Sequence, residues 1–195
     1  MSFHVKTKFI VGLTGSMLSG KSTALAYFAQ CGADTISCDE IVRKLYTRPA
    51  VLRKIKTLLG TADKKEIAAQ VFKNNVKCQA LENILHPLVL KQVKAQLKSC
   101  KRNIIVIEAP LLFEAGWEKF TDLNIDVLAD PKTLSARLQE RKLSRAEYTR
   151  RTRYQWPDMQ KAIRADVVFF HTTKAQLKQS VMRFCKAMNL LHVKK

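Results

Sequence analysis

The sequence lacks long apolar runs, paired cysteines and clustered histidines. No uninterrupted apolar stretch in its 195 residues approaches the roughly 20 residues that a membrane-spanning helix needs, and residues 1–8 lack the apolar segment of a signal peptide. Its five cysteines include no C-x-x-C pair and its four histidines show no metal-ligand spacing, which argues against a zinc site and a disulfide framework. We therefore expect a cytoplasmic protein with reduced thiols and no membrane association.

Acidic residues are also scarce. The chain has 16 Asp and Glu residues against 35 Lys and Arg residues, so its formal net charge is +19. The segment 137–195 alone contains 15 basic and 4 acidic residues. Such a surplus of positive charge indicates polyanionic partners, which could be nucleotides, nucleic acids or anionic surfaces. A solvated basic surface without a ligand gives the same charge, so the charge alone does not choose among these classes.

Short apolar segments alternate with helical patterns along the chain. Strands are predicted at 9–13, 33–37, 103–108, 124–129 and 167–171. Helices are predicted at 21–30 and after the capping sequences at Asp130-Pro131, Ser144 and Thr173. This alternation is typical of a parallel α/β sheet with right-handed crossovers.

The stretch between the second and third predicted strands is too long for a simple crossover. Residues 40–99 are mainly helical in pattern, with Pro49 in a first helical turn and Asp63 in a cap position. We expect His86-Pro87 to interrupt this pattern, because the residue before a proline is disfavoured in a helix. The stretch is therefore predicted to be an inserted helical subdomain.

The loop after the first predicted strand carries the clearest chemical signal. The segment from Gly15 to Ser22, GSMLSGKS, fits G-x-x-x-x-G-K-[ST] without a mismatch and stands between a strand and a helix. The two glycines let the backbone form an anion-binding nest, to which the following helix adds its positive end. Lys21 can reach the β- and γ-phosphates, and the Ser22 hydroxyl can ligate Mg²⁺. The predicted nucleotide-binding residues are Gly15, Ser16, Met17, Leu18, Ser19, Gly20, Lys21, Ser22 and Thr23.

Three carboxylates are candidates for the site. Asp39 follows the second predicted strand, at the edge where ligands of open α/β sheets bind. Asp39 can accept a hydroxyl proton during phosphoryl transfer; it also suits a helix N-cap, and the two roles are compatible. Glu108 ends the strongest strand, where a carboxylate can orient Mg²⁺, although its apolar neighbours equally fit a packed turn. Glu114 fits a surface position as well as a site.

A basic segment follows the fourth predicted strand. Arg137 and Arg141 are four residues apart, hence on one helical face, and both can reach a transferring phosphate. The segment 137–164 can close over that phosphate and exclude water. A solvated basic helix is the alternative, and we favour it for Arg145 and for the pair 150–151.

Taken together, these stretches resemble the dephospho-CoA kinase family over about residues 9–190. The resemblance rests on the loop and on five further motifs: 38–43 (CDEIVR), 86–87 (HP), 110–114 (PLLFE), 137–141 (RLQER), and Gln155 with 165–166. It implies ATP-dependent phosphorylation of the ribose 3′-hydroxyl of dephospho-CoA, the last step of coenzyme A synthesis. The small-molecule substrates would be ATP and dephospho-CoA, with Mg²⁺ as cofactor and no specific nucleic acid. The resemblance is compatible with a monomer or a small homo-oligomer.

The resemblance also implies roles for individual residues. Asp39 would be the base, Lys21 and Arg137 would steady the γ-phosphate, and Ser22 would hold Mg²⁺. Arg141 would belong to a lid over ATP. The acceptor-binding residues would be Asp39, Arg43, His86 and Glu114.

The fold implied is an α/β, P-loop NTPase-type parallel sheet flanked by helices, forming one domain over 1–195. Its core would comprise 7–38, 102–136 and 165–195. A helical substrate-binding insertion would span about 40–100, and a basic helical lid about 137–164.

The chain departs from the family pattern at four places. Ser16 and Leu18 stand where the family has glycine and a small residue, and Lys64 stands where it has arginine. The segment 171–173 replaces an Asn-x-Gly near the adenine. Two other functions remain alternatives: another small-molecule or nucleoside monophosphate kinase, or a nucleic-acid-stimulated P-loop ATPase.

Overall fold

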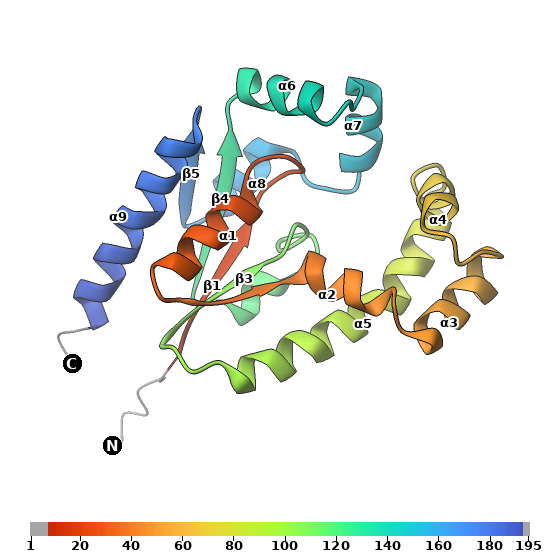
Figure 1. The fold of residues 1–195 in the computed structure, drawn as a ribbon, viewed down its shortest axis with the longest axis horizontal. Helices are drawn as coiled ribbons and strands as arrows, with labels where there is room; N and C mark the ends of the chain where they lie inside the picture. Colours follow the sequence, from red (N-terminus) through yellow and green to blue (C-terminus); the bar gives the residue numbers. More distant parts are fainter. Residues whose placement is uncertain (1–7, 193–195) are drawn as a thin grey trace. The chain divides into compact units, whose positions relative to one another are not determined.

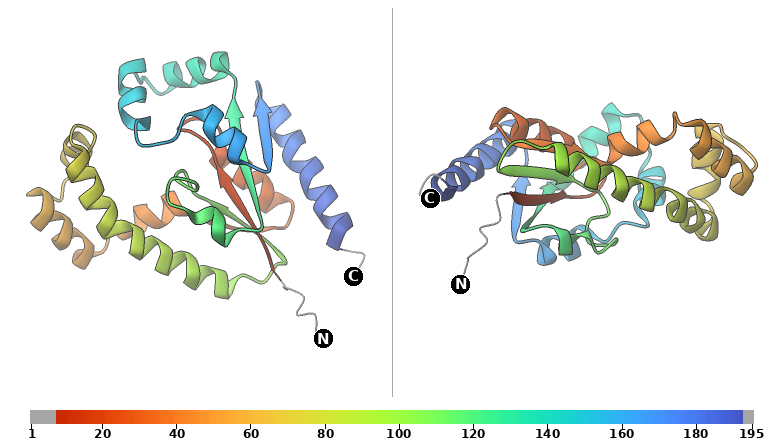
Figure 2. Two further views of the ribbon diagram at one scale, coloured as in Figure 1. Left: turned by 180° about the vertical axis from the view of Figure 1, so that it is seen from behind. Right: turned by 90° about the horizontal axis from the view of Figure 1, so that it is seen from below.

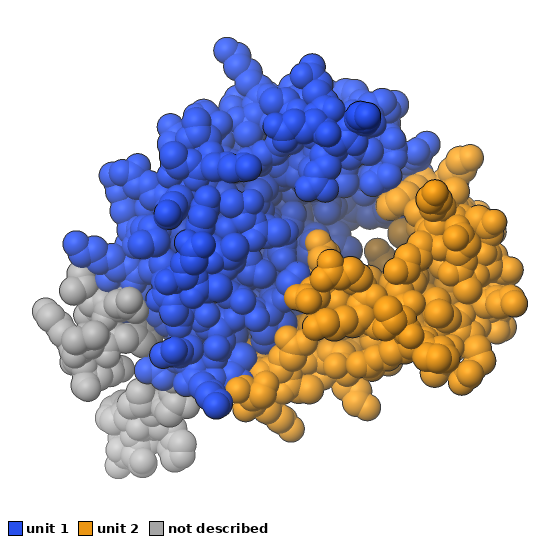
Figure 3. Space-filling view, in the orientation of Figure 1, with its two compact units in different colours: residues 1–37, 100–195 blue, residues 38–99 orange. Residues whose placement is uncertain are grey.

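The computed structural model describes residues 8–192, with side chains to residue 188. The expectation about a signal peptide therefore lies almost wholly outside the described residues. The chain divides into two compact units, coloured separately in Figure 3: a sheet unit within 1–37 and 100–195, and a helical unit of 38–99.

The sheet unit is built on five parallel strands in the order β2-β3-β1-β4-β5. They are β1 (Phe9–Thr14), β2 (Asp34–Ser37), β3 (Ile104–Glu108), β4 (Leu123–Ala129) and β5 (Val167–His171). Each lies within one residue of its predicted position at both ends, so the predicted parallel α/β sheet is confirmed. The first strand along the chain is the central one, and its carboxyl end therefore lies between those of β3 and β4.

Helices cover both faces of this sheet (Figures 1 and 2). The helices on the faces are α1 (Lys21–Gln30), α8 (Asp158–Arg164) and α9 (Lys174–His192). The sheet unit also contains α6 (Pro131–Glu140) and α7 (Arg145–Thr152), which lie beyond the carboxyl ends of the strands in Figure 1, and a 3₁₀ turn at Trp117–Phe120. The buried side chains of α1 and α9 pack on one face, around Phe28 and Val181. On the opposite face, α8 packs against β4.

The predicted capping sequences act as expected. The Asp130 carboxylate accepts hydrogen bonds from the first-turn N–H groups of α6, and the Ser144 hydroxyl accepts one from Glu147 N. The Thr173 hydroxyl accepts a bond from Gln176 N at the start of α9. Each cap satisfies N–H groups that have no partner inside the helix.

The helical unit contains α2 (Cys38–Leu45), α3 (Pro49–Leu59), α4 (Lys64–Val71) and α5 (Asn75–Ser99). The longest of these, α5, packs against the other three. Pro49 occupies the first turn of α3, and the Asp63 carboxylate caps α4, as predicted.

The predicted break at His86-Pro87 is wrong, because α5 continues through Pro87. An internal proline costs a helix about 3 kcal/mol through one lost hydrogen bond and a steric clash. Beyond the proline, Val89 and Val93 are buried, and each buried valine contributes roughly 1.5–3 kcal/mol. Packing of the second half of α5 therefore outweighs the local preference.

Candidate active site

The loop Gly15–Gly20 joins β1 to α1 at the carboxyl edge of the sheet, and both of its glycines are required. Gly15 has φ of +142°, and a Cβ there would lie 2.5 Å from the carbonyl oxygen of Val127. Gly20 has φ of +110° and stands at the N-cap of α1, which has no side-chain cap. The uncapped N–H groups of this helix and its positive end therefore face the loop, as an anion site requires.

Two cationic side chains hold carbonyl groups of this loop, one from the adjoining helix α1 and one from the distant helix α6. Lys21 is 7% exposed, and its Nζ donates to the carbonyl of Ser16 at 2.9 Å. Arg137 Nη1 donates to the carbonyl of Leu18 at 2.7 Å, and Leu18 itself has φ of +66°. The structure therefore brings the predicted phosphate-binding residues Lys21 and Arg137 to the same loop.

His171, at the end of β5, takes part in the same arrangement. It is completely buried, and its Nε2 lies 2.8 Å from the carbonyl oxygen of Ser19. Burial is the largest influence on its pKa, which is lowered, so the ring is neutral near pH 7. Because Nε2 faces a carbonyl oxygen, it carries the proton of the neutral ring.

A chain of oxygen atoms lies beside the loop. The Ser22 hydroxyl donates to Glu108 Oε1 at 3.0 Å, and the Ser37 hydroxyl donates to Oε2 of the same carboxylate at 2.8 Å. Glu108 is 1% exposed, whereas Ser22 is exposed. The end of β3 thus supplies a buried carboxylate that orients the predicted metal-binding hydroxyl, and the end of β2 supplies the Ser37 hydroxyl that holds this carboxylate.

The start of α8 and the segment just before it are each hydrogen-bonded to the phosphate loop. The Ser16 hydroxyl donates to Asp158 Oδ1, and Met17 N donates to Gln155 Oε1 at 3.1 Å. Ser16, a departure from the family pattern, therefore has a defined partner.

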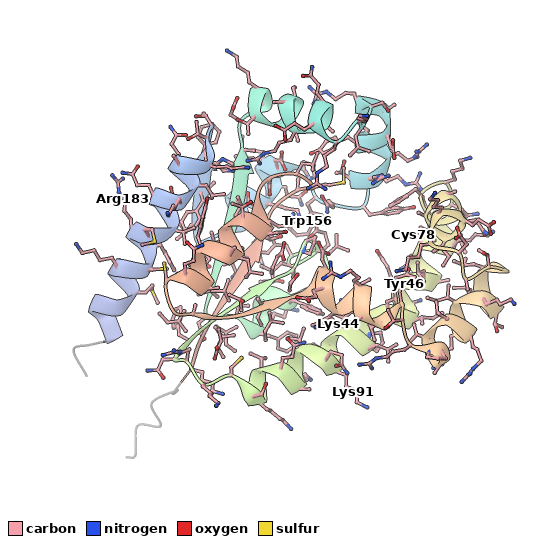
Figure 4. All side chains as sticks on the ribbon, viewed as in Figure 1. Lys44, Tyr46, Cys78, Lys91, Trp156 and Arg183 are labelled. Atoms are coloured by element: carbon pink, nitrogen blue, oxygen red, sulfur yellow. The ribbon has the colours of Figure 1, made fainter. Side chains whose placement is uncertain are left out.

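Glu114 forms a buried ion pair on the α8 face of the sheet. Its Oε1 accepts from Lys161 Nζ at 2.9 Å and from Trp156 N at 2.7 Å. Lys161 is completely buried and also donates to the carbonyl of Pro110 at 2.6 Å. The Trp156 ring, labelled in Figure 4, stacks on Phe113 with 6.1 Å between centroids. The structure thus gives Glu114 two partners within the protein.

Asp126, in the middle of β4, is a buried carboxyl that the sequence argument missed. It is 1% exposed, and among the described residues neither of its oxygens has a hydrogen-bond partner. Burial raises its pKa to about 6; Lys161 and Lys21 act in the opposite direction. The sequence did contain a signal for Asp126, because it is the single charged residue inside an otherwise mainly apolar strand.

The helical unit contains its own cavity, of about 460 Å³. Its charged lining residues are Asp39, Arg43 and Lys64, and its other lining residues are Val42, Tyr46, Ile67, Ala68, Val71, Phe72 and Leu81. Lys64 Nζ lies 5.9 Å from the centroid of the Tyr46 ring, and Tyr46 is labelled in Figure 4. The cavity thus combines an apolar wall with two cations and one carboxylate.

Three predicted residues occupy positions that the sequence did not specify. Asp39 lies within the first turn of α2, which begins at Cys38, so its interpretation as an N-cap is wrong. His86 is exposed on α5 and is not among the residues lining the cavity. Arg141 is the exposed C-cap residue of α6, one turn beyond Arg137.

Among residues 8–192, no helix is both long enough and apolar enough to cross a membrane.

A parallel sheet whose central strand leads through a glycine-bent loop into a helix, with a buried lysine and a serine–carboxylate pair, defines the P-loop kinase class. The sequence profile described as dephospho-CoA kinase matches residues 9–176. The chain belongs to the dephospho-CoA kinase family.

Individual relatives and solved structures are similar to this chain over most of its length. A dephospho-CoA kinase of Chlorobaculum tepidum is 35% identical over 178 residues, covering 83% of this chain and 86% of the relative. A crystal structure of a Thermus thermophilus protein is 28% identical with a TM-score of 0.82, covering 94% of this chain and 98% of that one. The structure of the dephospho-CoA kinase of Campylobacter jejuni is 26% identical with a TM-score of 0.63, covering 92% and 96%.

Proposed function

We propose that the protein transfers the γ-phosphoryl group of ATP to the ribose 3′-hydroxyl of dephospho-CoA, releasing coenzyme A and ADP. The observation that carries this proposal is the match of residues 9–176 to the dephospho-CoA kinase profile, in a chain with an intact phosphate loop. We further propose that it acts in the cytoplasm, as a monomer or small homo-oligomer.

The loop supplies the ATP site in this proposal. The backbone N–H groups from Gly15 to Thr23 surround the phosphates, and Lys21 moves its ammonium group from the Ser16 carbonyl to the β- and γ-phosphates. Arg137, already bonded to the loop at Leu18, balances the charge of the transferring group. Arg141 and the basic segment 137–164 cover the nucleotide and exclude water.

The oxygen donors beside the loop fit Mg²⁺, a hard cation that prefers oxygen ligands and retains several waters. Ser22 would hold the ion through its hydroxyl, and Glu108, which accepts a bond from that hydroxyl at 3.0 Å, would orient it. When bound, Mg²⁺ supplies charge neutralisation for the phosphate oxygens.

Asp39 is proposed as the base that takes the proton of the acceptor hydroxyl. The hydroxyl oxygen then attacks the γ-phosphorus as the bond to the ADP oxygen breaks. Asp39 follows Ser37 by two residues, so the chain holds their Cα atoms within roughly 7.6 Å of each other. Ser37 in turn donates a hydrogen bond to Glu108 at 2.8 Å.

The cavity of the helical unit is proposed as part of the acceptor site. Arg43 and Lys64 provide cations for the pyrophosphate of dephospho-CoA, and the apolar lining accepts uncharged parts of the molecule. His86 would act at the edge of the acceptor site. Glu114 would act through Lys161 and Trp156, its partners in the structure.

Measurement of ADP release with and without dephospho-CoA tests the proposal. We expect a strong acceptor-dependent rate and a product heavier by one phosphate. Faster turnover of a nucleoside monophosphate would instead assign a different small-molecule kinase. ATP hydrolysis stimulated by DNA or RNA and indifferent to dephospho-CoA would assign a nucleic-acid-dependent ATPase.

A further inference from the structure

Asp126 lies directly beside the start of the phosphate loop. In the register of β1 and β4 it stands opposite Thr14, the residue before Gly15. Its strand neighbours Ile125 and Val127 belong to the core cluster beneath α1 and α9. Because successive side chains of a strand alternate between faces, the carboxyl of Asp126 points to the α8 face.

Charged groups from three other elements surround this carboxyl. Lys21 comes from α1, Lys161 and Asp158 come from α8, and Glu114 comes from the turn after β3. Its strand neighbours across the sheet are Thr14 and, on β5, Val168, which carry no charge.

The two lysines near Asp126 donate hydrogen bonds elsewhere. Lys161 donates to Glu114 and to the Pro110 carbonyl, and Lys21 donates to the Ser16 carbonyl. The two cations therefore act on Asp126 only electrostatically, and its own oxygens have no hydrogen-bond partner in the part of the chain that the structure describes. A buried carboxyl in this position is poorly stabilised in its ionised form.

We propose that Asp126 is a positioning residue that competes with bound phosphate for the Lys21 ammonium group, so that nucleotide binding is coupled to proton uptake by the Asp126 carboxyl. This inference rests on the nucleotide-binding part of the proposed function. An ionised Asp126 attracts Lys21 and repels the phosphates. A protonated Asp126 does neither, and Lys21 is then available to the nucleotide.

Binding of nucleotide changes the surroundings of Asp126 in two ways, both of which favour protonation. The phosphates bring negative charge to the adjoining loop, and Lys21 turns its charge toward them. If these effects raise the Asp126 pKa by one further unit above about 6, ATP binds about fivefold more tightly near pH 6 than near pH 8.

The test is calorimetric titration of the full-length protein with MgATP, in buffers of different ionisation enthalpy. Wild type is expected to take up a fraction of a proton on binding and to show the fivefold pH dependence. Asp126→Asn, which mimics the protonated form, is expected to bind near pH 8 about as tightly as near pH 6, without extra proton uptake.

Asp122→Asn is the matched control. Asp122 immediately precedes β4 at the opposite end of the strand, where its Oδ2 accepts a bond from Ile10 N at 2.8 Å. It is expected to behave as wild type. The nucleotide's own protonation is common to all three proteins and cancels in the comparison.

Steady-state kinetics separates positioning from structural damage. In Asp126→Asn we expect a lower KM for ATP near pH 8 with kcat nearly unchanged. Equal proton uptake by wild type and Asp126→Asn would overturn the inference. Should the variant fail to fold, the wild-type measurement is sufficient by itself: absence of proton uptake in wild type would overturn the inference. Absence of ATP binding would overturn the proposed function as well, whereas binding without proton uptake would overturn only the role of Asp126.

Discussion

The Ser16 hydroxyl donates a hydrogen bond to the carboxylate of Asp158, a residue 142 positions later in the chain. This bond joins the phosphate loop to the first residue of α8. The nearby bond from Met17 N to Gln155 acts in parallel. Any movement of the loop on binding phosphate must therefore act on the start of α8.

A double-mutant cycle tests that link. Ser16→Gly and Asp158→Ala are each expected to destabilise the protein, because a hydrogen bond to a charged group contributes about 1.5–3 kcal/mol. The coupling energy between the two changes, measured by denaturant unfolding, should be about 1–2 kcal/mol. The cycle cancels the separate entropic cost of the introduced glycine. Strictly additive effects would contradict a direct link.

Asp39→Asn tests the proposed base. We expect kcat to fall by about 10²–10⁴-fold, because the variant cannot accept the hydroxyl proton. The dissociation constant for ATP, measured without acceptor, should change little. Glu40→Gln is the control, since Glu40 is the neighbouring acid and pairs on the surface with Arg43 and Lys44. An unchanged kcat in Asp39→Asn would remove the residue from the chemistry.

Lys21→Ala tests the phosphate loop itself. Loss of the ammonium group should weaken ATP binding and lower kcat by about 10²–10³-fold, because the charge acts on both ground state and transition state. Lys186→Ala, which removes an exposed lysine of α9, is expected to leave both quantities unchanged. Normal turnover in Lys21→Ala would be inconsistent with phosphoryl transfer at this loop.

The buried pair of Lys161 and Glu114 predicts a stability effect. Lys161→Ala leaves the Glu114 carboxylate without its cation in a site where only 11% of that side chain is exposed. The free energy of unfolding should fall by about 3–5 kcal/mol. The double replacement Lys161→Met with Glu114→Leu should recover part of that loss, and chemical denaturation measures both. A loss below about 1 kcal/mol in Lys161→Ala would contradict a strong ion pair.

The raised pKa of Asp126 leads us to expect that the free energy of unfolding depends on pH. Burial is the main cause that raises its pKa in the folded protein to about 6, from an ordinary value of 3.8. Between these values the folded state binds more protons than the unfolded state, so stability rises as pH falls through that window. Asp126→Asn removes the cost of the buried charge. The free energy of unfolding of the variant should exceed that of wild type by up to about 3 kcal/mol near pH 8, and this difference should fall below about 1 kcal/mol near pH 4.

Thermal and denaturant unfolding at several pH values measure this difference directly. The other carboxyl groups titrate in both proteins, so their contributions cancel when the curve of stability against pH of one protein is subtracted from that of the other. A difference independent of pH would show that Asp126 ionises as an ordinary aspartate.

The strands and most helix ends could be predicted because their signals are local. An apolar run such as β3 and a cap such as Asp130 require only a few adjacent residues. The predictions failed where tertiary packing opposed a local preference, as in α5 at Pro87. Asp39 was ambiguous for a related reason, since a cap and a first-turn residue differ by one or two positions.

The contiguous part of the candidate site was the most predictable, while Arg137 and Glu108 could be named only as candidates. The loop from Gly15 to Ser22 can be recognised from the spacing of its residues. The hydrogen-bond partners of Ser16 and Glu114, in contrast, come from distant segments of the chain. A single sequence does not reveal which acid faces which lysine. Asp126 was visible as an acid in an apolar strand, but its proximity to Lys21 depends on the order of strands in the sheet.

The order of strands also determines when the nucleotide site can form during synthesis. The ribosome completes β1 and β2 early, but these strands do not pair with each other, and β3 must lie between them. The whole helical unit is synthesised before β3 begins at Ile104. Closure of this long chain segment makes sheet assembly a late and slow event. The nascent chain therefore carries the complete phosphate-loop sequence long before it has a phosphate-binding loop.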